Sequence, residues 1–342
     1  MINQHMDKTL TIIVPAYNSA ATIEKCLDSL YHQDIQDEVE ILIVNDGSTD
    51  TTASIAQNYV DRHPSYRLIS KENGGHGSAI NVAAKIANGK YMKVIDSDDW
   101  VVNFCTYVKA LRTATADVVF SHFYTVDPSG KKIREYKMHH IPFGSQIQFK
   151  DFWEKRRHVQ DVCNFHGIAY KTAFYNATEV QLSEKISYED QEYTTLPFAK
   201  VKTVLALDLH FYRYQIGTPG QSMSTESQIK NLGQMETVLL NIIKQTPSWL
   251  NPTAKSYFLF KKCAMLLSYY MAAMIKNPKK KNGRAIVKSM NKKIKQTDLA
   301  LYKATRKSYR FCYILSYFNF SDTLKDKLQH FYLYRVFVRF LR

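Results

Sequence analysis

The sequence predicts an α/β fold in which a mostly parallel sheet is sandwiched by helices and is followed by an all-helical C-terminal subdomain. Short apolar runs alternate with segments of helical spacing in the N-terminal half, which is the pattern of repeated β-α-β units. Strand signals stop near Glu226, and a chain of 342 residues exceeds the usual size of a single core. Two domains are therefore expected, over residues 1–225 and 226–342.

The N-terminal elements follow one another closely enough to imply right-handed crossovers and helices on both faces of the sheet. Strands are expected at 10–15, 40–44, 66–69 and 92–95, with helices beginning near 18, 50 and 78. The carboxyl ends of parallel strands meet at one sheet edge, where ligands of α/β proteins usually bind. The loops after the first, second and fourth strands should therefore face one nucleotide-sized crevice.

The later elements are read in the same way, from apolar runs and helical stripes. Strands are expected at 117–121, 132–137, 165–170 and 205–214, with helices at 149–159 and 192–198. Beyond Glu226 the chain predicts helices at 228–244 and 254–276, a basic turn at 279–284, and helices from Ala285, Asp298 and Asp322.

The loop after the fourth strand, Asp96-Ser97-Asp98-Asp99, places three carboxylates within four residues. Like charges so close raise one another's pKa unless a cation or a dense set of donors neutralises them. A divalent metal explains such a loop at a strand end. The alternative is a polar loop in which one Asp caps the next helix.

A glycine-rich loop, Asn73-Gly74-Gly75-His76-Gly77-Ser78, lies between the third strand and the third helix. Its amides at a helix start could meet a phosphate, and the alternative is a flexible connector. No Gly-x-Gly-x-x-Gly follows the first strand, and no Gly-Lys-Ser/Thr loop occurs in the chain. These absences argue against a dinucleotide enzyme and a phosphate-loop ATPase.

Four motifs stand in order within the N-terminal domain: TIIVPAYN at 11–18, VNDGSTD at 44–50, ENGGHG at 72–77 with Asn81, and DSDD at 96–99. In this order and spacing they resemble the family 2 glycosyltransferases, which have the nucleotide-sugar-binding fold called GT-A. The resemblance extends more loosely to about residue 220. The Gln-x-x-Arg-Trp signature of processive polysaccharide synthases is missing, which favours single addition.

The resemblance implies a donor site at the sheet edge. Pro15, Ala16 and Tyr17 would line the nucleoside pocket, and Asp46 would bind the base or ribose edge. The resemblance also assigns donor contacts to Asn73 and Gly74 in the glycine loop, and to Asp96 and Ser97, with Asp96 nearer the ribose.

The metal ligands implied by the Asp-x-Asp motif are Asp98 first and then Asp99, which is either a ligand or a helix cap. The cofactor is Mg²⁺ or Mn²⁺, bridging the diphosphate. In many relatives a late loop closes over the diphosphate, which makes Arg213 and Ser222 candidate phosphate contacts.

Glu189-Asp190 resembles the catalytic pair of the family, in which the Asp takes the acceptor proton. Asp190 is interpreted as the base and Glu189 as a supporting or acceptor-binding residue. Because a carboxylate at a helix start is also stabilised by unpaired amides, Asp190 could be only a cap.

The expected function is inverting transfer of a sugar from a nucleotide-diphosphate donor, UDP-linked, to a hydroxyl of a glycan or lipid-linked acceptor in cell-surface polysaccharide synthesis. One alternative is a sugar nucleotidyltransferase, but the glycine-rich, lysine- or arginine-bearing loop after its first strand is absent here. Another is a non-catalytic nucleotide-sugar-binding scaffold, against which the intact Asp46, Asp98 and Asp190 argue. The sequence does not show an oligomeric state.

The net positive charge of the chain lies in its last quarter. Residues 251–342 hold 21 Lys and Arg against 3 Asp and Glu, a charge of +18, whereas residues 1–250 hold 25 against 28, a charge of −3. Aromatic residues interleave with these cations, which suits an anionic membrane surface. The alternatives are a solvated basic face over an aromatic core and, less favoured, nucleic-acid binding.

The expected location is the cytoplasm, with peripheral attachment at the inner face of the cell membrane. The first residues lack the layout of a signal peptide, and the five cysteines are scattered without metal spacing. The longest apolar run, Cys263 to Ile275, is shorter than the 18–20 residues that a membrane span needs.

Overall fold

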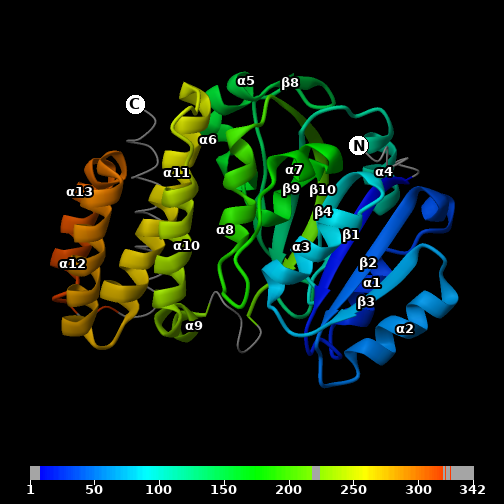
Figure 1. Ribbon diagram of the computed structural model, residues 1–342, viewed down its shortest axis with the longest axis horizontal. Coiled ribbons are helices and arrows are strands. Elements are labelled where there is room, and N and C mark those ends of the chain that lie inside the picture. Colours follow the sequence, from blue (N-terminus) through cyan, green and yellow to red (C-terminus); the bar gives the residue numbers. More distant parts are fainter. Residues whose placement is uncertain (1–7, 218–223, 319, 321–323, 325–342) are drawn as a thin grey trace. The chain divides into compact units, whose positions relative to one another are not determined.

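The structure is a computed structural model that describes residues 8–217, 224–318, 320 and 324 (Figure 1). The chain divides into two compact units, Met1–Thr218 and Pro219–Arg342. The assignment of a catalytic domain to residues 1–225 and a subdomain to residues 226–342 stays a prediction.

The first unit is built on a single sheet with the strand order β3-β2-β1-β4-β9-β6-β10-β5, with β7 paired to β6 and β8 to β10. The strands are β1 Lys8–Ala16, β2 Val39–Asp46, β3 Tyr66–Lys71, β4 Gly89–Val94, β5 Trp100–Val101, β6 Val118–Val126, β7 Lys132–Tyr136, β8 Gln146–Gln148, β9 Ile168–Lys171 and β10 Thr203–Gln215. The parallel part runs from β3 through β2 and β1 to β4. Beyond β4 the sheet is mixed, because β9 pairs antiparallel with both β4 and β6.

Short helices follow the strands of this unit. They are α1 Ile23–Ser29, η1 Gln33–Glu38, α2 Thr52–Arg62, α3 His76–Ile86, α4 Phe104–Arg112, α5 Phe149–Glu154, α6 Arg156–Val159, η2 Gln160–Val162, η3 Phe165–Gly167, α7 Thr172–Thr178, α8 Asp190–Tyr193 and η4 Leu196–Ala199. Alternate residues of β1 and β2, such as Ile12 and Ile41, share one buried cluster with Leu27 of α1 and Ala56 of α2. Helix α3 contacts the same two strands. The α/β fold predicted from the sequence is confirmed.

Several predicted elements of this unit differ from the structure. The first helix begins at Ile23, not near residue 18, and Asn18 itself takes a left-handed conformation with φ of 48°. The predicted helix at 149–159 is two short helices, and the predicted helix at 192–198 is also interrupted, by a break before Leu196. The predicted strand at 165–170 begins as a single turn of 3₁₀ helix at Phe165.

The second unit is helical, as predicted, and its helices cover the described part of the C-terminal region. They are α9 Thr225–Lys230, α10 Leu232–Gln245, α11 Pro252–Tyr270, the π-helical turn η5 Met271–Lys276, α12 Lys280–Thr297 and α13 Leu299–Leu315. The predicted basic turn at 279–284 is wrong, because α12 begins at Lys280 and runs through these residues. Gly283 lets α12 pack closely on η5, since a Cβ at residue 283 would lie 1.8 Å from the carbonyl oxygen of Ala273. The predicted helix from Asp322 lies outside the described residues.

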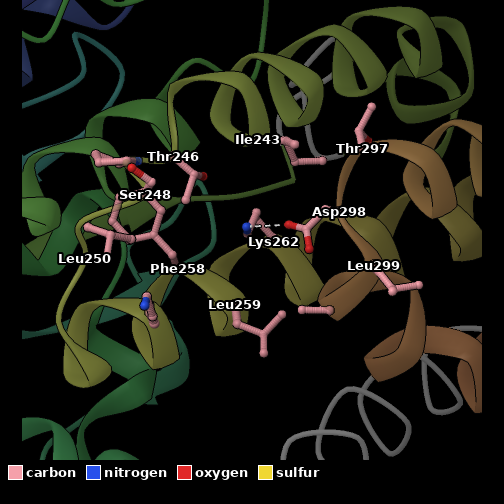
Figure 2. A pocket seen from close by; sticks show the side chains of 13 residues that line it. Ile243, Thr246, Ser248, Leu250, Phe258, Leu259, Lys262, Thr297, Asp298 and Leu299 are labelled. Atoms are coloured by element: carbon pink, nitrogen blue, oxygen red, sulfur yellow. Dashed lines mark hydrogen bonds and ion pairs between the residues drawn. The ribbon is translucent and has the colours of Figure 1, made fainter.

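Helix α11 and the η5 turn form a continuous helical stretch, Pro252–Lys276, that is longer than the apolar run read from the sequence. These 25 residues are long and apolar enough to cross a membrane, since an 18-residue window within them has a mean hydropathy of 1.3. In the structure 78% of this window is buried, as in the core helix of a folded domain. The stretch also lines a pocket whose walls come from α10, α11 and α13 (Figure 2).

Candidate active site

The acidic loop 96–99, which follows β4, is held by hydrogen bonds to β10. Asp99 is buried, and its carboxylate accepts hydrogen bonds from the Tyr212 hydroxyl at 2.6 Å and from the Gln215 amide at 2.7 Å. The Tyr212 hydroxyl also accepts from the Asp96 amide at 3.1 Å. The helix-cap alternative for Asp99 is wrong, because α4 begins at Phe104 with Asn103 at its N-cap.

Three side chains at this loop lie close enough to share a cation. One ligand atom from each of Asp96, Asp99 and His166 falls within 4.8 Å of the others. Burial raises the pKa of Asp99 well above its ordinary value, and the charges of Asp96 and Asp98 raise it further. Because a cation would offset these penalties, the residues present fit a divalent metal.

The imidazole of His166 was not anticipated from the sequence. Burial lowers its pKa to about 4, which leaves it neutral and able to ligate. Its ring stacks on Tyr214 with 4.0 Å between centroids. Asp98, which the sequence predicted as the first ligand, is partly exposed and does not belong to the group of three. The ligand roles of Asp98 and Asp99 stay predictions.

The predicted base lies near the acidic loop, although 91 residues separate Asp190 from Asp99. Burial raises the pKa of Tyr214, and four carboxylate charges raise it further: Asp99, Asp96, Asp190 and Asp98. Asp190 is the first residue of the four-residue helix α8, and its carboxylate accepts from the Gln191 side chain at 2.8 Å. The N-cap of α8 is Glu189, whose side chain makes no capping hydrogen bond.

A second unanticipated histidine, His76, joins the acidic loop to the residue that precedes α8. Its Nδ1 lies 2.6 Å from the Glu189 carboxylate, and its Nε2 lies 2.9 Å from that of Asp96. Burial by itself would lower the pKa of His76, but the hydrogen bonds and charges of the two carboxylates outweigh it and raise that pKa well above its ordinary value. The only signal in the sequence was its position in the glycine-rich loop.

The glycine-rich loop is ordered by Asp46. The amides of Gly74 and Gly75 donate to the Asp46 carboxylate at 2.9 and 2.7 Å, and Lys71 Nζ lies 2.6 Å from it. The Asn73 side chain donates to the backbone carbonyl of Asp46 at 3.0 Å. The flexible-connector alternative is therefore wrong. The donor contacts assigned to Asp46, Asn73 and Gly74 stay predictions.

The predicted nucleoside residues lie at the end of β1. Pro15 and Ala16 are buried in the strand, whereas Tyr17 is 52% exposed, so that its ring is open to a ligand. Ser97 shares a 2.7 Å hydrogen bond with the Ser19 hydroxyl, which fixes the acidic loop to the segment that follows β1. The loops after β1 and β4 are thus joined, as the parallel register of these strands requires.

One of the two predicted phosphate contacts, Arg213, lies near the end of β10. The Arg213 guanidinium is half-buried and lies over the Tyr124 ring, 4.6 Å from its centroid. Its phosphate contact stays a prediction. Ser222 lies outside the described residues.

Comparison with known proteins identifies the family. The model of Glycosyl transferase family 2 matches residues 11–177, which include the acidic loop, the glycine-rich loop and His166. These residues are a family 2 glycosyltransferase domain. The family 2 glycosyltransferase resemblance read from the four motifs is confirmed.

Curated relatives agree with this assignment. The chain is 29% identical over 212 residues to the uncharacterized glycosyltransferase EpsJ of Bacillus subtilis, covering 60% of each protein. It is 37% identical over 133 residues to chondroitin synthase of Pasteurella multocida, covering 38% of this chain and 14% of the synthase. The chain thus spans less than two thirds of the length of either relative.

The similar solved structures support the fold. Residues 1–349 of S. aureus TarS in complex with UDP-GlcNAc superpose with a TM-score of 0.58 at 19% identity, covering 88% of this chain and 91% of that one. The mannosyltransferase PcManGT from Pyrobaculum calidifontis in complex with GDP-Man and Mn²⁺ gives 0.51 at 20% identity, covering 90% and 85%. The family 2 domain therefore has the GT-A fold.

Proposed function

We propose that this protein is an inverting glycosyltransferase that moves a sugar from a UDP-sugar to a hydroxyl of a glycan or lipid-linked acceptor in cell-surface polysaccharide synthesis. The observation that carries the proposal is the gathering of four carboxylates around Tyr214 in a family 2 domain. The TarS complex with UDP-GlcNAc supports the donor class, and the similarity to chondroitin synthase supports a glycan product.

The donor side is formed by the loops after β1, β2 and β4. Tyr17 would stack on the nucleoside base, and Asp96 would accept from a ribose hydroxyl. Mg²⁺ or Mn²⁺ would supply charge neutralisation of the leaving diphosphate when bound. Asp98 and Asp99 would hold the ion, and His166 offers a further neutral ligand atom close to Asp99.

The acceptor side is formed by Glu189 and Asp190. Asp190 would accept the proton of the acceptor hydroxyl as its oxygen attacks the anomeric carbon from the face opposite the diphosphate. Positive charge develops on the sugar ring in such transfers, so the surrounding carboxylates stabilise it. Because Asp190 lies at the start of a short helix with Gln191 bonded to its carboxylate, its side chain is held in place before an acceptor binds.

A donor screen tests the proposal. Thermal unfolding is followed with UDP, GDP, UDP-sugars and GDP-sugars, each with and without Mn²⁺, and the stabilising sugars are then tested for hydrolysis. We expect metal-dependent stabilisation and slow hydrolysis with a UDP-sugar and not with a GDP-sugar. A preference for GDP-sugars would overturn the donor class alone, and no response to any nucleotide would overturn the function.

We also propose that the basic C-terminal region attaches the protein reversibly to an anionic membrane surface. Ile314, Tyr317 and Phe318 are exposed on and after α13, and Arg284 lies over the Tyr317 ring at 4.1 Å. Each cation near an anionic surface adds about 1 kcal/mol, an attraction that salt screens. Flotation should show binding to anionic but not neutral liposomes, lost in high salt or on deleting about the last forty residues. If the region bound nucleic acid instead, the alternative in which it is a nucleic-acid-binding surface would be favoured.

A further inference from the structure

His76 occupies a position between two segments that are far apart in the sequence. It is the first residue of α3, and its ring contacts Asp96, which follows β4, and Glu189, which precedes α8. The ring also packs on Phe165, 5.6 Å between centroids. One side chain therefore touches a carboxylate assigned to the donor and another assigned to the acceptor.

In both hydrogen bonds of His76 with a carboxylate, the imidazole ring is the donor. An ionised carboxylate only accepts hydrogen bonds, so a ring that bonds to two carboxylates donates from both nitrogens. Hydrogen bonds of this charged kind contribute more than neutral ones and fix geometry more strongly. Glu189 is 4% exposed, and its oxygen lies 2.6 Å from His76 Nδ1, which holds that carboxylate in one orientation beside Asp190.

The glycine-rich loop is shaped to receive the Glu189 segment. A Cβ on Gly77 would lie 2.4 Å from the carbonyl oxygen of Ser183 and 2.9 Å from Cγ of Glu189. The Lys185 amide donates to the carbonyl of Gly74 at 2.7 Å. The absence of a side chain at residue 77 thus lets the chain before α8 approach the start of α3, which brings Glu189 within reach of His76.

We propose that His76 is a positioning residue that fixes the acceptor-side carboxylate of Glu189 through Nδ1 and the donor-side carboxylate of Asp96 through Nε2. The inference rests on the proposed function, because it takes from it the donor role of Asp96 and the acceptor role of Glu189. Each ring nitrogen then serves a different half of the reaction, and the two contacts can be removed separately.

Two conservative variants separate the contacts. In His76→Asn the amide nitrogen takes the place of Nδ1, which keeps the donor to Glu189 and removes the one to Asp96. In His76→Gln it takes the place of Nε2 and does the reverse. UDP affinity with Mn²⁺ is measured by calorimetry, and kcat is measured for hydrolysis of the UDP-sugar that stabilises the wild type most.

The expected results differ between the variants. His76→Asn should weaken UDP binding about tenfold and leave kcat within about twofold. His76→Gln should leave UDP binding within about twofold and lower kcat about tenfold. Tenfold is about 1.4 kcal/mol, close to the contribution of one hydrogen bond to a charged group. In a Glu189→Ala background, which lacks the acceptor of the Nδ1 hydrogen bond, His76→Gln should lower kcat no further. The matched controls are His158→Asn and His158→Gln, at an exposed histidine away from the site.

Other results would overturn the inference. If both variants changed the same parameter, or neither changed any, His76 would serve only the packing of α3, and a lowered unfolding temperature in both would identify that role. Retained effects of His76→Gln in the Glu189→Ala background would also overturn it. A wild-type protein that neither binds UDP nor hydrolyses a UDP-sugar would overturn the proposed UDP-sugar function itself, and the inference with it.

Discussion

Both units of the chain bury charged side chains, but they balance them differently. Around Tyr214 in the sheet unit four carboxylates gather, joined by Glu189, and His76 pairs with two of these five carboxylates, Asp96 and Glu189. In the helical unit Lys262 and Asp298 form one pair at 2.6 Å, with side chains 7% and 12% exposed (Figure 2). The carboxylates around Tyr214 thus carry an excess of negative charge, whereas Lys262 and Asp298 balance each other.

The helical pair is complete in its hydrogen bonds as well as its charge. The second carboxylate oxygen of Asp298 accepts from the Leu301 amide at 2.9 Å and so caps α13. The pair therefore links α11 to the start of α13 inside the pocket that Figure 2 shows. A buried charge costs free energy unless it is paired, so a balanced pair indicates architecture, whereas an unbalanced cluster indicates a ligand.

The largest expected effect is the loss of transfer in Asp190→Asn. The amide cannot accept the acceptor proton, and a positioned base contributes about 10²–10⁴-fold. UDP affinity by calorimetry should stay within about twofold, because the change lies on the acceptor side. If UDP affinity and transfer fell together, Asp190 would be part of the donor site or of the fold, and the two sides would not be separable.

Breaking the balanced pair should affect stability and not the site. Lys262→Met leaves Asp298 buried without its partner, and we expect a loss of about 3–5 kcal/mol in the free energy of unfolding by urea. The control is Lys293→Met, which breaks the more exposed pair with Glu236 and should cost less than about 1 kcal/mol. Equal costs for the two variants would contradict the structural role of the buried pair.

Lys93 is a buried basic side chain of the sheet unit, and its protonation gives another test of how this unit holds buried charge. It is fully buried on β4, donates to the carbonyls of His166 and Ile168, and has its pKa lowered to about 7 by burial. In the unfolded chain the pKa of Lys93 is about 10.4. Between about pH 7 and pH 10.4 the unfolded chain therefore holds the Lys93 proton and the folded chain does not, so the free energy of unfolding should rise by up to ~1.4 kcal/mol per pH unit.

The measurement for Lys93 is urea unfolding at several pH values above and below 7, compared with Lys93→Met. The stability difference between wild type and variant should shift in favour of the wild type as the pH rises from about 7 to 9 and stay constant below the folded pKa. A difference that does not change with pH would mean that the two carbonyls keep the ammonium charged throughout.

The smallest effect is expected for one ligand of the proposed metal. Asp98→Ala removes one carboxylate from the proposed metal site, so UDP binding in the presence of Mn²⁺ should weaken about tenfold, ~1.4 kcal/mol. Calorimetry of UDP with and without Mn²⁺ should show that the metal no longer strengthens binding. Unchanged enhancement would assign the ion to the group of Asp96, Asp99 and His166 alone.

The sequence alone was enough to predict which loops come together at one edge of the sheet. Pro15 and Asp46 lie at the ends of β1 and β2, Asp96 follows β4, and β1 pairs in parallel with β2 and β4. In a parallel sheet the ends of neighbouring strands must meet, so local patterns determine which loops come together. The helical nature of the C-terminal unit followed from stripes of apolar residues in the same way.

Tertiary structure decided the contacts between these loops and the rest of the chain. The bonds of His76 to Glu189 and of Asp99 to Tyr212 each join residues 113 apart, and no local pattern records such a pairing. The role of Gly283 was misread for the same reason, because a glycine suits a turn and a close helix contact equally well. Sequence periodicity reports which face of an element is buried, whereas the partner on that face is chosen by packing of the whole chain.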